Sequence, residues 1–245
     1  MLDYLDALAR ATTLEDAWNL HCRSMAAFGF DRLIYGNTRF GTRESLGPFE
    51  DALFLTNHDP AYVDGFIRGK MFLDAPILRW ARENTGACSW GAIWRDRERL
   101  TPEECKVVAF NTSMEVTAGY SISFAEANPR DFGMIALTAR RGLSQAEVDE
   151  IWQVDGREIE AMNNMAHLKF RALPQTTARG LLSKRQLEVL GWVGQGKSNQ
   201  DIAQILDVSV ATVEKHLRLA RDRLGVDTTA QALLKASVLN QIFRL

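Results

Sequence analysis

Residues 182–226 read LSKRQLEVLGWVGQGKSNQDIAQILDVSVATVEKHLRLARDRLGV, and this stretch sets the architecture of the C-terminal part of the chain. Four helix starts in this part carry a Ser or Thr N-cap with a polar residue three positions later: Ser183 with Gln186, Ser198 with Asp201, Ser209 with Thr212, and Thr228 with Gln231. Gly196 and Gly225 stand where C-terminal glycines of helices are expected. The middle helices, 199–206 and 210–224, are separated by a short turn at 207–209, which predicts a helix-turn-helix.

The second helix of this pair has an apolar face and a mainly basic face. The apolar residues recur at helical spacing and are expected in the core: Val213, Leu217, Ala220 and Leu224. In a helix-turn-helix the second helix enters the major groove of DNA, while the first crosses the backbone. The residues expected to contact DNA are exposed on this helix or begin one of the pair: Lys197, Ser198, Ser209, Thr212, Glu214, Lys215, Arg218 and Arg221. A solvated helix with ordinary surface charge is the alternative interpretation.

Each of these residue types has a definite partner on DNA. Arg218 can make a bidentate contact to guanine, and Lys215 and Thr212 can reach bases or phosphates. The backbone amides near Ser209 suit a phosphate oxygen. The charge distribution agrees, since residues 179–245 hold ten Lys/Arg and six Asp/Glu, a net charge of +4, which leaves −6 on residues 1–178. A basic module that follows an acidic one indicates a polyanion as its partner.

A longer pattern runs through the C-terminal part: Leu182-Ser183-Lys184-Arg185-Gln186-Leu187-Glu188-Val189-Leu190, Gly196-Lys197-Ser198-Asn199, Ile202-Ala203, Val208-Ser209, Thr212-Val213, His216 and Leu224-Gly225-Val226. This pattern resembles the LuxR-type DNA-binding domain, with the family's spacing intact. Gln186 stands where the family usually has glutamate, and can still close the capping box. Glu214 stands where many members have a basic or polar residue that reads bases, so it could select cytosine or repel a phosphate. The resemblance implies a double-stranded DNA operator as partner, with RNA polymerase as a further candidate.

The segment LPQTTARG, residues 173–180, mixes Pro, Gly and Thr without an apolar period and is expected to be a linker. It separates residues 1–172 from residues 181–245. Before the linker, helical patterns alternate with strand-like ones: helices at 2–9, 17–26, 101–115 and 144–170, strands at 28–36, 53–56, 119–125 and 132–139. The order predicts an α+β fold with helices on both sides of a mainly antiparallel sheet, followed by a small all-α four-helix domain.

The N-terminal part carries a second pattern: Thr56-Asn57-His58, Tyr62 and Phe66, Asp74 and Pro76, Trp90, then Val116 and Gly119. This order resembles the acyl-homoserine-lactone-binding domain of quorum-sensing LuxR-type regulators. The resemblance implies an α-β-α sandwich for residues 1–172, with the lactone held between the sheet and one helical layer. It implies no cofactor or metal besides this signal ligand. A phosphoacceptor receiver domain does not fit, because the chain does not open with a strand followed by an acidic pair.

The same resemblance implies roles for single residues. Tyr62 stands where the family usually has the tryptophan that donates to the lactone carbonyl, and a phenol can do the same. Phe66 replaces a usual tyrosine and keeps only the ring. Trp90 and Gly119 match directly, the first packing on the lactone and the second leaving room for it. The remaining residues expected to line the pocket are Val107 and Val116.

The acidic residue of the family pattern is displaced in this sequence. The family has Asp directly before Pro, whereas the run Leu73-Asp74-Ala75-Pro76 puts Ala75 there. A one-residue bulge could aim Asp74 at the amide N–H of the ligand; otherwise Asp74 is a surface residue and the pocket uses another acceptor. Ala136 also stands where Ser or Thr often contacts the acyl amide, so Ser121 or His58 is expected to compensate.

These patterns favour two regulatory functions over a third hypothesis, that the protein is an enzyme. The first is a lactone-responsive homodimer that binds a two-fold symmetric operator. Its candidate dimer surfaces are the helix 145–170 and the last helix, whose apolar residues could equally be core: Leu233, Leu234, Val238 and Leu239. The second is an orphan regulator that binds a different small molecule or none. An enzyme would need a catalytic constellation, and the four histidines show neither metal spacing nor a nucleophile motif.

Composition excludes several other classes. The 245 residues are 46% hydrophobic and 24% charged with a net charge of −2, which is ordinary globular composition. Apolar stretches stop short of a membrane-spanning length and no signal peptide is recognisable, so no membrane partner and a cytoplasmic location are expected. The three cysteines, Cys22, Cys88 and Cys105, lack paired spacing and are expected to be reduced and buried, with a reactive or ligand-facing role as the alternative.

Overall fold

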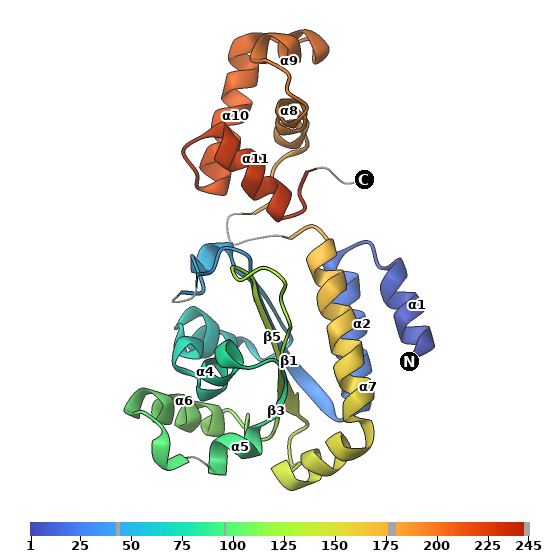
Figure 1. Ribbon diagram of the computed structural model, residues 1–245, viewed down its shortest axis with the longest axis vertical. Helices are drawn as coiled ribbons and strands as arrows, with labels where there is room; N and C mark the ends of the chain where they lie inside the picture. Colours follow the sequence, from blue (N-terminus) through green and yellow to red (C-terminus); the bar gives the residue numbers. More distant parts are fainter. Residues whose placement is uncertain (43–44, 96, 176–179, 243–245) are drawn as a thin grey trace. The chain divides into compact units, whose positions relative to one another are not determined.

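The computed structural model describes residues 1–42, 45–95, 97–175 and 180–242. The chain divides into two compact units, Met1–Gly47 with Ala52–Phe170, and Pro48–Asp51 with Arg171–Leu245 (Figure 1). The main division therefore falls between Phe170 and Arg171. Within the expected linker 173–180, residues 176–179 lie outside the described residues.

The first unit is built on one five-stranded sheet. Its strands are β1 Phe30–Thr38, β2 Leu53–Thr56, β3 Gly86–Ser89, β4 Gly119–Ser123 and β5 Phe132–Ala139, in the order β2-β1-β5-β4-β3. Every neighbouring pair is antiparallel, which confirms the expected sheet. In the turn between β4 and β5, the amide of Asp131 donates a hydrogen bond of 2.9 Å to the carbonyl of Asn128.

Helices cover both faces of this sheet, as the α-β-α sandwich requires (Figure 1). One layer holds α1 Leu2–Arg10, α2 Leu14–Ala27 and the long α7 Gln145–Ala172. The opposite layer begins with short turns: α3 Pro60–Tyr62, a π-helical turn Val63–Arg68 and a 3-10 turn Met71–Asp74. It continues with α4 Pro76–Glu83, α5 Trp90–Arg95 and α6 Pro102–Ser113. A short 3-10 turn at Arg97–Arg99 lies between α5 and α6, and another at Phe49–Asp51 belongs to the second unit.

The two faces of the sheet contact different helical layers. The hydroxyl of Tyr35 lies 2.9 Å from Nδ1 of His167 on α7, and the ring of Tyr120 stacks on Trp152 of α7 at 3.9 Å. Because successive strand residues point to opposite faces, their neighbours face the α3–α6 layer. Around β4 the residues of that second face are small, with Gly119 paired to Thr138 and Ser121 to Ala136. Gly36 on β1 is small as well, whereas its partners Phe54 and Met134 are large.

The C-terminal unit contains four helices, α8 Lys184–Gly194, α9 Asn199–Ile205, α10 Val210–Leu224 and α11 Thr229–Val238. The four expected N-caps are confirmed, each side chain accepting a hydrogen bond from the backbone N–H three residues later. Gly225 ends α10 in the left-handed region at φ 64°, where glycine carries no Cβ penalty. The pair α9–α10 is the expected helix-turn-helix.

Two further expectations concern composition. In the described part of the chain, no helix is both long and apolar enough to cross a bilayer. All three cysteines are free, as expected, but only Cys88 is buried. The expectation of burial is wrong for Cys105, because the helix α6 turns this side chain toward solvent, and Cys22 is only half-buried.

Candidate functional site

The helix α10 separates its apolar and basic residues onto two faces. Val213, Leu217, Ala220 and Leu224 are buried at 5% exposure or less, as their spacing predicts. Lys215, Arg218 and Glu214 are exposed on the other side. The polar face of the helix-turn-helix is therefore available to a partner.

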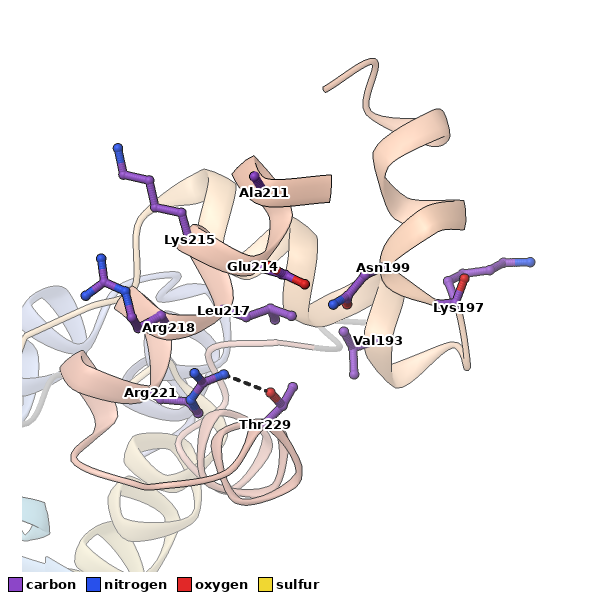
Figure 2. A pocket seen from close by; sticks show the side chains of 11 residues that line it. Val193, Lys197, Asn199, Ala211, Glu214, Lys215, Leu217, Arg218, Arg221 and Thr229 are labelled. Carbon is purple, nitrogen blue, oxygen red and sulfur yellow. Dashed lines mark hydrogen bonds between the residues drawn. The ribbon is translucent and has the colours of Figure 1, made fainter. Parts of the chain in front are cut away.

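This face forms one wall of a groove of about 650 Å³ that also involves the ends of α8, α9 and α11 (Figure 2). Most of the residues expected to contact DNA line it: Lys197, Ser198, Glu214, Lys215, Arg218 and Arg221. Ser209 and Thr212 lie outside the groove, at the N-terminus of α10, where Ser209 caps the helix. Five groove residues were not expected to line this site from the sequence: Val193, Asn199, Ala211, Leu217 and Thr229. Asn199 and Thr229 each directly follow a recognised N-cap, which is the signal that could have found them.

The cations of the groove are held to different degrees. Arg221 donates from Nη1 to Oγ1 of Thr229 at 3.1 Å, the bond drawn in Figure 2. Arg218 makes only a long ion pair, 3.4 Å, with Asp222, and both side chains are about 60% exposed. The side chain of Arg218 can therefore change direction at little cost in free energy. The side chain of Glu214 points toward Asn199 in the same view.

In the first unit, the predicted ligand residues form two groups. The first is a stack of rings around Tyr62, which lies parallel to His58 at 4.5 Å, to Phe66 at 5.0 Å and to Phe110 at 5.6 Å. The phenol of Tyr62 donates to Oδ1 of Asn111 at 2.9 Å. Burial raises the pKa of Tyr62, so its hydroxyl stays protonated and remains a donor.

His58 adds a neutral imidazole to this stack. Its Nε2 lies 3.3 Å from Oγ1 of Thr138 on β5, and its side chain is buried. Burial, assisted by the positive charge of Arg32, lowers the pKa of His58 to about 3. A neutral ring offers one donor and one acceptor, which suits an uncharged polar ligand.

The second group joins Trp90, Gly119 and Ser121. The indole Nε1 of Trp90 donates to Oγ of Ser121 at 3.0 Å, and Ser121 is fully buried. A Cβ on Gly119 would lie 3.1 Å from the indole ring and 2.2 Å from the carbonyl oxygen of Leu137. Only glycine allows the ring to lie this close to β4.

The remaining predicted residues lie in the same helical layer with different exposure. Val107 and Val116 are buried at 2% and 5% exposure. Asp74 is exposed at the end of its 3-10 turn, whereas Ala75 is buried as the N-cap of α4 and Pro76 is buried at the first helical position. The surface alternative for Asp74 is thus the arrangement present, because the helix start turns residue 75 inward instead of residue 74.

Comparison with known proteins identifies the family. Residues 13–170 match the family described as "Autoinducer binding domain", and residues 180–236 match "Bacterial regulatory proteins, luxR family". Transcriptional activator protein SolR of Ralstonia nicotianae is 30% identical over 222 residues, which cover 87% of this chain and 86% of SolR. The chain belongs to the LuxR family of regulators with an autoinducer-binding domain, and is a DNA-binding transcriptional regulator rather than an enzyme.

Solved structures share the fold. CepR2 from Burkholderia cenocepacia, described as an N-acylhomoserine lactone dependent LuxR family transcription factor, aligns with a TM-score of 0.54 at 21% identity, over 69% of this chain and 92% of CepR2. Escherichia coli SdiA aligns with a TM-score of 0.52 at 18% identity, over 98% of this chain and 96% of SdiA, and SdiA has also been solved in complex with octanoyl-rac-glycerol. Among the described residues of the present chain, no cluster of His, Cys, Asp and Glu could hold a metal ion.

Proposed function

We propose that this regulator binds an acyl-homoserine lactone between the sheet and the α3–α6 layer, and that the bound form recognises its operator as a homodimer. The observation that carries the proposal is the group formed by Trp90, Gly119 and Ser121. It combines a ring held against a glycine with a buried hydroxyl, at the part of the sheet face around β4 where the paired residues are small.

The polar groups of this layer suit the lactone head. The protonated phenol of Tyr62 can donate to a ligand carbonyl in place of Asn111. With Asp74 exposed, we assign the acceptor for the ligand amide N–H to Oγ of Ser121, since a hydroxyl oxygen has two acceptor positions and Trp90 occupies one. Phe66, Val107 and Val116 supply apolar surface for the acyl chain.

A second copy of the chain is the proposed partner of α7. Val154, Met165 and Leu168 are 81%, 44% and 60% exposed. Val154, exposed Ala161 and Leu168 recur every seven residues, and Met165 lies between the last two at the four-and-three spacing of a coiled-coil seam. We call these four residues the α7 seam. In α11, Leu234 is 66% exposed, but Leu239, which directly follows the helix, is buried core, so only part of this region is available. A two-fold dimer presents two copies of α10 to a two-fold symmetric operator.

On DNA, Arg218 and Lys215 are proposed to read bases, while Lys197, Ser198 and Arg221 hold phosphates around the groove. Thr212 and the amides capped by Ser209 would meet the backbone at the start of α10. Such a regulator would work in the cytoplasm, with RNA polymerase as a further partner.

The test is to express the full chain with each of a panel of acyl-homoserine lactones and analyse extracted small molecules by mass spectrometry. The melting temperature is measured with and without each compound. A ligand at a thousand times its Kd adds about 4 kcal/mol to the free energy of unfolding. One retained lactone with a matching rise in melting temperature supports the proposal; folded, DNA-binding protein that retains none and shows no shift refutes it.

A second candidate is favoured by the exposed Asp74 and the buried Ala75. Without a carboxylate acceptor, the site depends less on a ligand amide, so an acyl ligand that lacks this amide is an alternative signal. Octanoyl-rac-glycerol is the probe for this possibility, because it carries an acyl chain and hydroxyl groups but no amide. A larger thermal shift with this compound than with any lactone would favour the second candidate.

A further inference from the structure

Trp90 is flanked on both sides by contacts from the first turns of α7. The preceding residue, Ser89, donates from Oγ to Oδ1 of Asp149 at 2.7 Å. The amide of the following residue, Gly91, donates to the same Ser89 oxygen at 3.1 Å. A Cβ on Gly91 would lie 3.3 Å from Cγ of Gln145, so α7 packs closely against this turn. The backbone on either side of the indole is thereby tied to one helix.

Gln145 also holds the residue beneath the indole. Its Oε1 accepts from the backbone N–H of Gly119 at 2.9 Å, and its Nε2 donates to the carbonyl of Gly119 at 3.2 Å. The side-chain amide thus pairs with both backbone groups of Gly119, as a neighbouring strand would. Gly119 lies against the Trp90 ring, so Gln145 fixes the surface on which that ring rests.

Asp149 joins these contacts into one network. Its Oδ1 accepts from Nε2 of Gln145 at 2.9 Å as well as from Ser89, and Nε2 of Gln145 also reaches Oγ of Ser89 at 3.1 Å. Burial alone would raise the pKa of Asp149, but hydrogen bonds from Gln145, Ser89 and Tyr120 outweigh it and hold the pKa below its usual value. The carboxylate therefore stays ionised and accepts hydrogen bonds at neutral pH.

We propose that Gln145 and Asp149 are positioning residues for Trp90, which orient its indole for the ligand from the start of α7. This inference rests on the proposed function for the ligand role of Trp90, but the positioning itself is independent of ligand identity. Because the α7 seam lies further along the same helix, the network also links the ligand layer to the proposed dimer surface. The experiment must distinguish this positioning role from a simpler one, in which the network only attaches α7 to the sheet.

The test uses the ligand-free full chain labelled with ¹⁵N-tryptophan, with the Trp90 indole resonance assigned from Trp90→Phe. In Gln145→Met, which keeps side-chain length but loses the hydrogen bonds, the Trp90 indole resonance is expected to shift or broaden while the other indole resonances stay in place. Asp149→Asn is expected to act in the same direction. Gln153→Met, at an exposed position of the same helix, is the matched control and should change nothing.

Binding of N-octanoyl-homoserine lactone gives a second measurement. Gln145→Met is expected to weaken it about tenfold, the size of effect that one lost hydrogen bond produces. If Gln145→Met does not fold, Ser89→Ala removes the shared hydroxyl and is read in the same way. An unchanged Trp90 resonance in folded variants overturns the proposal. A perturbed resonance in a protein that binds no lactone even as wild type keeps the positioning role and refutes the proposed ligand instead.

Discussion

Trp90 and Ser121 are joined by a 3.0 Å hydrogen bond from the indole to the hydroxyl, at the part of the sheet face around β4 where the paired residues are small. Gly119 lies two residues before Ser121 on β4, against the six-membered ring of the indole, and the missing Cβ at this position leaves the space that the ring occupies. One glycine thus determines how closely the ring approaches the sheet.

We expect Gly119→Ala to lower both stability and ligand response. The added Cβ would lie 2.2 Å from the carbonyl oxygen of Leu137, and this backbone atom cannot move without distorting the β4–β5 pairing. Overpacking of this kind costs about 1–3 kcal/mol. Denaturant unfolding and thermal shift with lactone measure the two effects. Gly191→Ala is the control, since nothing lies within 4 Å of its position; a Gly119→Ala protein with full ligand response would contradict the assignment.

Arg218→Ala should weaken specific operator binding about 10- to 100-fold, the range expected for one lost bidentate contact to guanine. Stability should stay close to that of the wild type, because the exposed side chain makes only a 3.4 Å ion pair with Asp222. Fluorescence anisotropy with operator DNA and a melting curve give both values. Arg223→Ala removes the same charge from the same helix outside the groove and should have a smaller effect. Unchanged operator affinity would refute the role of Arg218.

Glu214→Gln tests whether the acidic residue of the groove reads a base. A carboxylate accepts a hydrogen bond from N4 of cytosine and repels phosphates. The substitution is therefore expected to reduce preference for cytosine at one operator position and to strengthen binding to unrelated DNA. Affinities for a set of operators changed at single positions check both effects. If neither changes, Glu214 is a solvated surface residue.

Local signals explain which parts of the fold were predictable. The helix starts at Ser183, Ser198 and Thr228 follow from capping residues three positions apart, and these caps depend on neighbours in the sequence alone. The strand β3, Gly86–Ser89, was missed because its four residues include no β-branched or large aromatic side chain. In the region 60–83 the apolar residues do not recur at one regular spacing, because this region consists of short α, π and 3-10 segments.

The candidate site depends more on tertiary contacts. The pairing of Gln145 with Gly119 spans 26 positions, and that of Tyr62 with Asn111 spans 49, so no local spacing reveals either. The orientation of Asp74 depends on where α4 begins, and a difference of one residue decides which side chain faces inward. Residue identities therefore indicate candidate residues for the proposed ligand site, but not the hydrogen bonds that these residues make.

Three buried histidines predict how the stability of the first unit depends on pH. Burial lowers the pKa of His21 to about 4, although its hydrogen bond with Asn163 opposes this. Burial with the charge of Arg32 lowers the pKa of His58 to about 3, and burial with the charge of Arg39 lowers that of His167 to about 4. In the unfolded chain all three rings gain protons near pH 6.5. The stability of the first unit is thus complete above pH 6.5 and falls as the pH drops toward 4, by up to about 4 kcal/mol per pH unit. Urea unfolding between pH 7.5 and 4.5 measures this slope.

His21→Gln should reduce that slope by about a third, since one of the three titrating rings is removed. The hydroxyl of Tyr4 lies 2.8 Å from Nδ1 of His21, so the variant also loses some stability at every pH. The slope, rather than the absolute stability, is therefore the diagnostic quantity. A slope that is flat from pH 6.5 to 5 in the wild type would contradict the prediction.

Val154→Glu and Leu168→Glu test the α7 seam as a dimer surface. Both side chains are more than half exposed in the single chain, and full burial of one such side chain contributes about 1.5–3 kcal/mol. A two-fold interface contains each position twice, so either charge should weaken dimerisation by about 100-fold or more. Sedimentation of ligand-saturated protein measures the change, with Gln153→Glu adding the same charge beside the seam as control. Dimers that survive both seam variants would place the interface elsewhere.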